Sequence, residues 1–222
     1  MSEEKVYMYI STLKFFKEFW NENEYDIKVK LVSKLKELEE FFSDKLISIK
    51  YYYSLRHNCD IIFWVSSFDT NTLIKFRITM NKLFSEIGEE NYSLLSIYKQ
   101  SPYFKAKHNL AEYLKLKPLR YFVAYPMKKS PEWYLLPFSD RDEMMSEHIT
   151  TAMNHPKAKG IRSYTTYSFG ITEDEFVVIY ELTSLDNWVE VVEKLREVKA
   201  RKWTLREEPV LIGERIEFNN VF

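Results

Sequence analysis

Hydrophobic and polar positions alternate in short blocks along this chain, and the period changes repeatedly between two residues and three or four. Residues 5–16 alternate and are rich in β-forming side chains, which predicts a strand. In the next block, 26–46, an apolar residue recurs at every third position, which predicts a helix whose apolar stripe is Val32, Leu35, Leu38 and Phe41. Two β-rich runs at 47–55 and 59–67, with a polar turn around position 57, predict a hairpin.

Two further elements complete a first set in the order strand, helix, strand, strand, helix, strand, and a second set then repeats this order. A helix is predicted over 70–88, with Gly88 at its C-terminal end, and a strand over 92–100. The second set comprises strands at 120–127, 159–169, 174–182 and 209–218, and helices at 139–155 and 184–203. We therefore expect an α+β protein built from two tandem ferredoxin-like (βαββαβ) halves, 1–112 and 113–222, whose antiparallel sheets pack as a dimeric α+β barrel.

Composition excludes several classes of partner. The 32 basic and 33 acidic side chains leave a net charge of −1 and are interspersed, so no nucleic-acid partner is expected. No apolar run is long enough to span a membrane. The one cysteine, Cys59, cannot form an intramolecular disulfide and is expected to be a buried thiol, which fits a soluble protein of the cytoplasm.

Most local motifs of catalysis are missing. The four glycines are too dispersed to form a phosphate-binding loop, and no cluster of cysteine, histidine and carboxylate has the spacing of a zinc site. The acidic runs "EE", "DRDE" and "REE" are expected to lie on a solvated surface, because their pattern is that of exposed helix and turn positions.

The helix predicted at 139–155 carries the most informative residue. Ser139 is expected to cap its N-terminus and Pro156 to mark its end. His148 and His155 would lie about 10 Å apart along the axis, too far to share one metal ion. His148 falls on an otherwise apolar stripe with Met144, so it is either a core histidine or a single axial ligand of a porphyrin iron.

A second candidate residue ends the strand at 120–127. Tyr125 precedes Pro126, and Lys129 and Trp133 follow closely. Tyr125 could cap a sheet edge, or it could be a redox-active phenol with a base nearby for an acidic group of a substrate. Sequence position alone leaves both readings open.

Five segments in order resemble motifs of the chlorite dismutase-like superfamily, and most closely its coproheme decarboxylase branch. They are "YPMKK" (125–129), "EWYLLP" (132–137), "DRDEMMSEH" (140–148), "GITEDEF" (170–176) and "PVLIG" (209–213). The resemblance is clearest from 121 to 213.

This resemblance implies a haem-dependent oxidoreductase. His148 would be the proximal iron ligand, Tyr125 the tyrosine that forms a radical and Lys129 a group on the propionate side, with Trp133 as an aromatic neighbour. The cofactor or substrate would be heme b or iron coproporphyrin III, hydrogen peroxide would be the co-substrate, and the assembly would be a homopentamer. The implied reaction is the oxidative decarboxylation of two propionates to give haem b.

Other positions depart from the family pattern. The column that holds glutamine in decarboxylases and arginine in chlorite dismutases falls on Ser163, and the adjacent Arg162 must point to the opposite face of a strand. These departures disfavour chlorite chemistry, which in the family depends on that arginine. Chlorite decomposition or a weak peroxidase activity is the alternative enzyme reading, and a non-catalytic porphyrin-binding or structural oligomer is the alternative of another class. Lys117 is the candidate propionate base, chosen from a set with Lys115 and Arg120, and the residue supporting the histidine would be Glu197 or Lys199.

Overall fold

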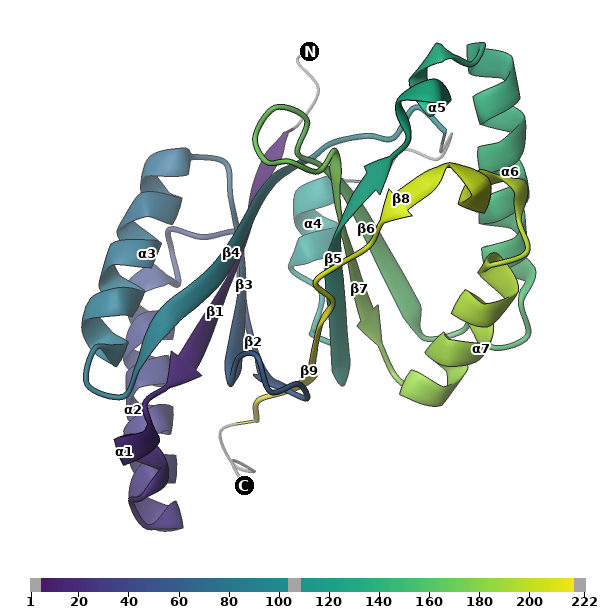
Figure 1. Ribbon diagram of the computed structural model, residues 1–222. Coiled ribbons are helices and arrows are strands. Elements are labelled where there is room, and N and C mark those ends of the chain that lie inside the picture. The colour runs from purple at the N-terminus through teal and green to yellow at the C-terminus, as the bar shows by residue number, and fades with distance from the viewer. Residues whose placement is uncertain (1–4, 104–108, 218–222) are drawn as a thin grey trace.

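The computed structural model describes residues 5–103 and 109–217, and its elements follow the predicted order (Figure 1). The first half contains β1 (Val6–Phe15), α1 (Lys17–Trp20), α2 (Glu24–Phe42), β2 (Ser48–Ser54), β3 (Ile61–Ser67), α3 (Thr70–Phe84) and β4 (Gly88–Tyr98). The second half contains α4 (Leu110–Leu114), β5 (Tyr121–Lys129), α5 (Pro131–Leu135), α6 (Phe138–Asn154), β6 (Ile161–Tyr167), β7 (Phe176–Leu182), α7 (Leu185–Leu195), the 3-10 helix η1 (Lys199–Trp203), β8 (Thr204–Arg206) and β9 (Leu211–Arg215).

The strands form one closed antiparallel sheet, which confirms the predicted fold class. The first half contributes the order β4-β1-β3-β2 and the second half β6-β7-β5-β9. Strand β4 pairs with β6 through Ile97 and Tyr167, and β2 pairs with β9 through residues 52–54 and 213–215. These two junctions close the barrel, and β8 extends β5 outside it.

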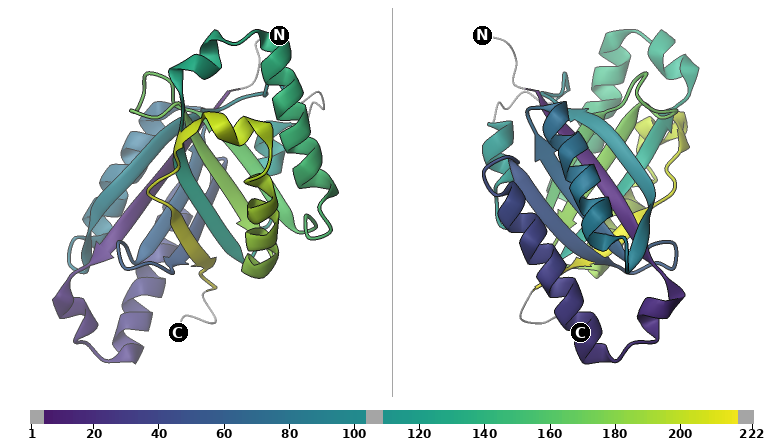
Figure 2. Two further views of the ribbon diagram at one scale, coloured as in Figure 1. Left: turned by 45° about the vertical axis from the view of Figure 1, so that its right-hand side comes forward. Right: turned by 90° about the vertical axis from the view of Figure 1, so that its left-hand side faces the viewer.

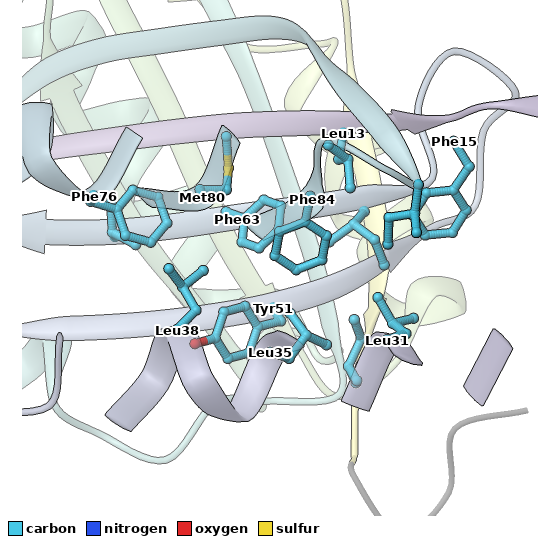
Figure 3. Close-up of a cluster of buried hydrophobic side chains, with 14 of the residues drawn as sticks. Leu13, Phe15, Leu31, Leu35, Leu38, Tyr51, Phe63, Phe76, Met80 and Phe84 are labelled. Atoms are coloured by element: carbon cyan, nitrogen blue, oxygen red, sulfur yellow. The ribbon is translucent and has the colours of Figure 1, made fainter. Parts of the chain in front are cut away.

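The helices cover the outside of the barrel. Figure 2 shows α2 and α3 over the sheet of the first half, and α6 and α7 beside that of the second. In the first half, α2 buries Ile27, Leu31, Leu35, Leu38 and Phe42 against the sheet, and α3 buries four side chains (Figure 3). The predicted stripe of α2 was correct at Leu35 and Leu38, which are buried. It was wrong at its two ends, because Phe41 is 50% exposed and Val32 is only partly buried.

A second core fills the barrel itself. It is built from side chains of both halves, among them Tyr52 and Trp64 from the first half and Phe122 and Tyr164 from the second. Cys59 is buried at its margin, as expected. Because the two halves share this interior, neither has a complete core without the other.

Two predicted helix ends differ from the structure. Helix α3 ends at Phe84, and Gly88 is the first residue of β4, where an added Cβ would lie 2.5 Å from the carbonyl oxygen of Lys14. The chain uses glycine there because two strands approach closely, not because a helix ends. Helix α6 begins at Phe138 after Pro137, so Ser139 does not cap it and instead donates a hydrogen bond to Asp140. Its end at Asn154, before His155 and Pro156, is as predicted.

The helix predicted over 184–203 was wrong at its end, because α7 stops at Leu195 and a separate 3-10 helix, η1, covers residues 199–203. The other boundaries lie closer to expectation. The division proposed at residues 112 and 113 falls within α4, and the predicted last strand ends earlier, at Arg215; its final residue, 218, lies outside the described residues. Within residues 5–103 and 109–217, no helix has both the length and the apolar character needed to cross a membrane.

Candidate functional site

The outer face of the second-half sheet carries three polar side chains in a row. Tyr125 on β5 is paired with Val178, and Tyr180 on β7 is paired both with Val123 and with Ser163 on β6. Paired residues project to the same face of a sheet, and alternate residues to opposite faces. The intervening residues, such as Phe122 and Tyr164, fill the barrel, so Tyr125, Tyr180 and Ser163 share the face that α6 and α7 cover.

Helix α6 covers this face without being packed tightly against it. None of its 17 residues is fully buried, whereas the 19-residue α2 buries five. The side chains of Met144, Met145 and His148 are only partly buried. A helix that forms one wall of a ligand site is expected to leave its inward side chains partly uncovered in this way, because the ligand completes the packing.

His148 lies on α6, and its surroundings favour the neutral form of its imidazole. Burial lowers its pKa, the positive charge of Lys129 lowers it further, and Glu207 opposes both effects. Among the described residues, no hydrogen bond joins the His148 imidazole to another side chain or to the backbone. A neutral imidazole with an unshared nitrogen lone pair is the form that binds a metal ion.

Lys129 is the most deeply buried cation near the histidine. Its side chain is 7% exposed, and its amine donates hydrogen bonds of 3.1 Å to the carbonyl oxygen of Ala200 and to Thr204 Oγ1. The amine also lies 4.9 Å from the centre of the Trp133 ring. Burial lowers the pKa of Lys129 to about 8, against the opposing effect of Glu207, so this amine can gain or lose a proton close to neutral pH.

The segment "GITEDEF" holds the end of β5 in place. Glu175 Oε2 accepts a 2.8 Å hydrogen bond from the backbone N–H of Lys129. Asp174 accepts two hydrogen bonds from the guanidinium of Arg206 on β8, of 3.0 and 2.7 Å. A bidentate pair of this kind fixes orientation as well as distance. The motif thus positions Lys129 through its backbone.

Glu207 is the central residue that the sequence did not reveal. It forms ion pairs with Arg196, directly after the end of α7, at 2.9 Å, and with Arg201 on η1. Its charge acts on the pKa values of Tyr125, Lys129 and His148. It belongs to "REE", for which a solvated surface was expected, but its side chain is only 20% exposed. Only the folding of α7 and η1 around it reveals this role.

Tyr125 is held as a neutral phenol. Its pKa is raised well above the ordinary value by burial first, and then by Tyr180 and Glu207. Tyr180 lies beside it on the same face of the sheet, followed by Ser163 on β6, and burial also raises the pKa of Tyr180. Ser163, Tyr180 and Tyr125 therefore form one line of hydroxyl groups across three strands.

A groove of about 540 Å³ adjoins this cluster between α6 and η1. It is lined by Met144, Arg196, Val198, Lys199, Arg201, Lys202 and Trp203. Two contacts hold its walls together: Glu147 accepts a 3.0 Å hydrogen bond from the backbone of Lys199, and Glu143 pairs with the amine of Lys199 at 3.1 Å. A larger hollow of about 760 Å³, which includes Trp20, Arg120 and Glu214 in its lining, includes none of Tyr125, Lys129 and His148.

Several candidate residues lie away from the cluster. Lys117 is exposed in the loop before β5, where its carbonyl oxygen accepts a hydrogen bond from Arg162. Lys115 pairs with Glu112, and Arg120 with Glu214. Among the described residues, no side-chain contact joins these three bases to His148 or Tyr125, and their assignment to a propionate stays a prediction.

Two further candidates also pair elsewhere. Glu197 is 65% exposed and bonded to Lys194, and Lys199 is paired with Glu143, so neither contacts the imidazole of His148. Arg162 points into the barrel toward Glu181, as its strand position predicted.

The residues present fit an iron porphyrin better than a bare metal ion. Within the described ranges, no group of three or more histidine, cysteine and carboxylate side chains could hold a metal ion by itself. One imidazole on a helix that also carries Met144 and Met145, over a sheet face that carries the oxidisable phenol of Tyr125, matches a cofactor that brings its own equatorial ligands. Fold and site together define a closed α+β barrel with a single-histidine site between helix and sheet.

The chain belongs to the chlorite dismutase family. The family model described as "Chlorite dismutase" matches residues 28–216. A coproheme decarboxylase of Mycolicibacterium smegmatis is 29% identical over 171 residues, which cover 75% of this chain and 71% of that protein.

Solved structures show the same fold. The crystal structure of TA0507, provisionally described as a chlorite dismutase, is 42% identical, covers 96% of both chains and superimposes with a TM-score of 0.87. A heme-binding protein of Thermus thermophilus is 16% identical, covers 98% of this chain and 94% of its own, and has a TM-score of 0.81. At that identity the second likeness shows the fold alone.

Proposed function

We propose that this protein binds an iron porphyrin through His148 and uses hydrogen peroxide to decarboxylate two propionates of iron coproporphyrin III, giving haem b. One observation carries the proposal: a partly buried histidine without a hydrogen-bond partner among the described residues lies in the same layer as Tyr125, Lys129 and Trp133. The likeness to a coproheme decarboxylase supports the choice of substrate.

The bound porphyrin would be held between α6 and the sheet, with Met144 and Met145 beside the imidazole. It would supply the reaction of ferric iron with peroxide, which is chemistry that no side chain provides. The contribution of the chain is to hold the macrocycle, to keep His148 neutral and to manage hydrogen atoms and protons around it.

Tyr125 would act as the carrier of hydrogen atoms. Its raised pKa keeps the hydroxyl protonated, so the phenol can lose one electron and one proton together. The resulting phenoxyl radical then takes a hydrogen atom from a propionate side chain. Each propionate loses two electrons, one proton and carbon dioxide on becoming a vinyl group, and reduction of one peroxide to two waters accepts the two electrons. The balance therefore requires one peroxide for each propionate.

Lys129 would assist at the carboxylate end of the reaction. A protonated amine attracts a propionate, and an amine with a pKa of about 8 can also release its proton near neutral pH. Its hydrogen bonds to Ala200 and Thr204 fix the direction in which it presents the remaining proton.

Chlorite decomposition is the weaker proposal. The family resemblance ties that reaction to an arginine in the column that Ser163 occupies, and Arg162 cannot replace it because its guanidinium is engaged inside the barrel. A change of strand register would be needed to bring Arg162 to the outer face.

We further propose that the protein acts in the cytoplasm as a homopentamer. Four exposed apolar side chains support an assembly through α5, the start of α6 and the loop before β7: Leu135, Phe138, Phe169 and Ile171, which are 83%, 51%, 49% and 41% exposed. Apolar side chains that are this exposed and close together are typical of protein interfaces. Sedimentation equilibrium tests the assembly, and a monomer would contradict it.

The reaction is tested with ferric coproporphyrin III and stoichiometric additions of peroxide, followed by mass spectrometry of the extracted porphyrin. Native protein should give the mono-decarboxylated species and then haem b. Tyr125→Phe should bind the porphyrin and yield neither product, because a phenyl ring has no hydroxyl hydrogen to give. Tyr121→Phe is the matched control, since Tyr121 lies on the same strand and the same face.

Two results would contradict the proposal. One is native protein that binds the porphyrin and leaves both propionates intact after peroxide. The other is full decarboxylation by Tyr125→Phe, which would assign the hydrogen transfer to another residue. Oxygen release from chlorite by the loaded native protein would favour the weaker alternative.

A further inference from the structure

Three oxidisable aromatic side chains follow one another from β5 to α7. The ring centres of Tyr125 and Tyr180 lie 6.2 Å apart, and the two phenols are neighbours on the outer face of the sheet. The ring centre of Tyr180 lies 4.3 Å from that of Trp188. The three rings thus form a continuous line of contacts that begins at Tyr125.

The fold explains why these rings meet. In the pairing of β5 with β7, Tyr180 lies opposite Val123 and Tyr125 opposite Val178, so the two phenols are diagonal neighbours on the outer face. Helix α7 starts directly after β7, capped by Ser184, whose hydroxyl accepts a hydrogen bond from the backbone of Asn187. The short connection places Trp188, in the first turn of α7, over Tyr180. Trp188 is partly exposed, so the line ends at the surface.

We propose that Tyr180 and Trp188 form a relay that carries an oxidising equivalent from Tyr125 to the surface of α7. There a one-electron reductant of the enediol or phenol class, such as ascorbate, is oxidised. The proposal rests on the proposed function, because peroxide acting at the bound porphyrin is the oxidant. The relay adds a peroxidase-type activity to the same site and discharges the radical when no propionate is in place.

Each step of the relay balances. The Tyr125 phenoxyl radical takes one electron and one proton from the hydroxyl of Tyr180, its neighbour on the outer face of the sheet. The Tyr180 radical then takes one electron and one proton from the indole N–H of Trp188, and Trp188 takes one hydrogen atom from the reductant. Two reductant molecules are oxidised by one electron each for every peroxide reduced to two waters.

Local charge favours this route over a second pair of aromatic residues. Trp133 and Trp203 lie 6.4 Å apart, but the amine of Lys129 lies 4.9 Å from the Trp133 ring. A cation at that distance disfavours loss of an electron from the indole. The negative charge of Glu207 instead acts on Tyr180, and a negative charge favours loss of an electron from its phenol.

The relay is tested first without any porphyrin. A photogenerated oxidant, sulfate radical from persulfate and a ruthenium tris(bipyridine) sensitiser, oxidises accessible indoles within a flash, and transient absorption distinguishes indolyl from phenoxyl radicals. The flash oxidises Trp188 from the surface and so drives the reversible exchange between Trp188 and Tyr180 in the inward direction, whereas in the relay consumption of the reductant at Trp188 draws the same exchange outward. In native protein, phenoxyl absorption should therefore grow as indolyl absorption decays, because oxidised Trp188 takes a hydrogen atom from Tyr180. This growth should be lost in both Trp188→Phe and Tyr180→Phe.

Two control variants and a second measurement, the oxidation of ascorbate, accompany the flash experiment. Trp20→Phe and Tyr25→Phe remove an exposed indole and an exposed phenol in the first half, and should leave the growth unchanged. In protein loaded with ferric coproporphyrin III, peroxide-driven oxidation of ascorbate should be lost in Trp188→Phe and retained in Trp20→Phe.

Equal phenoxyl growth in native protein, Trp188→Phe and Tyr180→Phe would overturn the relay. So would ascorbate oxidation that is unchanged in loaded Trp188→Phe. Failure of the proposed function is recognised separately, by native protein that takes up no ferric coproporphyrin III while the flash experiment still shows transfer from Trp188 to Tyr180. Thermal unfolding of each variant identifies any that has failed to fold, and Trp188→Leu, which also lacks an oxidisable ring, then replaces Trp188→Phe.

Discussion

Lys129 combines two properties that oppose each other. Its amine is buried, which disfavours the charged form, yet it donates hydrogen bonds to two oxygens that favour that form. Burial has the larger effect and lowers the pKa of the amine to about 8. At neutral pH the folded protein therefore holds a proton on Lys129 at a cost that the unfolded chain does not bear.

This cost predicts how stability depends on pH. Between the folded pKa of about 8 and the unfolded pKa of about 10.4, the unfolded chain binds a proton at this position and the folded chain does not, so stability rises with pH. From pH 7 to pH 9.5, the free energy of unfolding of native protein should rise by about 2 kcal/mol relative to Lys129→Met. Urea unfolding of both proteins at the two pH values measures the difference.

The exposed Lys194 provides the control for this experiment. Its side chain is 51% exposed and pairs only with Glu197, so Lys194→Met should show no comparable change with pH relative to native protein. If native protein and Lys129→Met respond identically to pH, Lys129 is not desolvated as described.

The sequence revealed the site residues that belong to motifs, but it did not reveal those whose role depends on contacts between distant strands. Tyr125, Lys129 and His148 stand in ordered motifs, and in the structure the charge of Glu207 acts on all three, while their roles stay predictions. Tyr180 is one of 16 tyrosines and has no motif of its own. Its place beside Tyr125 follows from strand register, which depends on contacts distant in sequence. The role of Lys117 as a propionate-binding base stays a prediction, because no hydrogen bond or ion pair among the described residues joins its side chain to Tyr125, Lys129 or His148.

At the scale of elements, the apolar stripe of α2 shows how a period can mislead. An interval of three residues turns back about 60° at each step, so Val32, Leu35, Leu38 and Phe41 spread around half of the helix. The buried positions Leu31, Leu35, Leu38 and Phe42 alternate intervals of four and three and therefore stay on one face. The two stripes share Leu35 and Leu38 and differ at their ends. The sequence contains an apolar residue at every position of both, so only the packing of α2 against the sheet shows which stripe is buried.

Stability measurements on α2 should separate the two stripes. Leu35 is fully buried, so Leu35→Ala should reduce the free energy of unfolding by about 2–5 kcal/mol through lost contacts and a cavity. Phe41 is 50% exposed and packs on Phe42 and Lys45, so Phe41→Ala should cost less than about 1 kcal/mol. A larger loss for Phe41→Ala than for Leu35→Ala, measured by denaturant unfolding, would support the three-residue stripe instead.

Short elements were the main omissions from the sequence-based prediction. Helices α1 and α5, the 3-10 helix η1 and the strand β8 contain three to five residues each, too few for any period to be visible. Three of them matter to the site: α5 carries Trp133, and η1 and β8 supply the oxygens of Ala200 and Thr204 that hold Lys129. Residues 199–203 were expected to be the end of a helix, and no element was predicted for 204–206.

At the scale of the whole molecule, Glu181 binds the two halves together inside the barrel. It is fully buried on β7 and lies 3.1 Å from the amine of Lys50 on β2. It also accepts hydrogen bonds from Tyr52 and Tyr164, one from each half. The desolvated amine of Lys50 has a lowered pKa, which the negative charge of Glu181 opposes.

Removing the charge of Glu181 should destabilise the entire barrel. Glu181→Gln leaves Lys50 buried without a counter-ion and should cost about 3–5 kcal/mol of unfolding free energy. Fluorescence and circular dichroism should still report one shared transition, because both halves contribute to one interior. Glu214→Gln, whose ion pair with Arg120 is exposed, should cost less than about 1 kcal/mol. Two separate transitions in native protein would contradict the shared core.

The repeat of six elements was sufficient to predict two halves and a barrel, but not how the barrel closes. Closure depends on Ile97 pairing with Tyr167 and on residues 52–54 pairing with 213–215. Partners so far apart in sequence leave no local pattern, so only the structure identifies them.

The central claim is that His148 is the one protein ligand of a porphyrin iron. Titration of the apoprotein with ferric coproporphyrin III, followed by the Soret band, tests it most directly. Native protein and His155→Ala, which alters the histidine at the end of the same helix, should bind with equal affinity and the same spectrum, whereas His148→Ala should lose the spectrum of imidazole-bound iron and bind more weakly. An identical titration for native protein and His148→Ala, or no binding by native protein, would contradict the account.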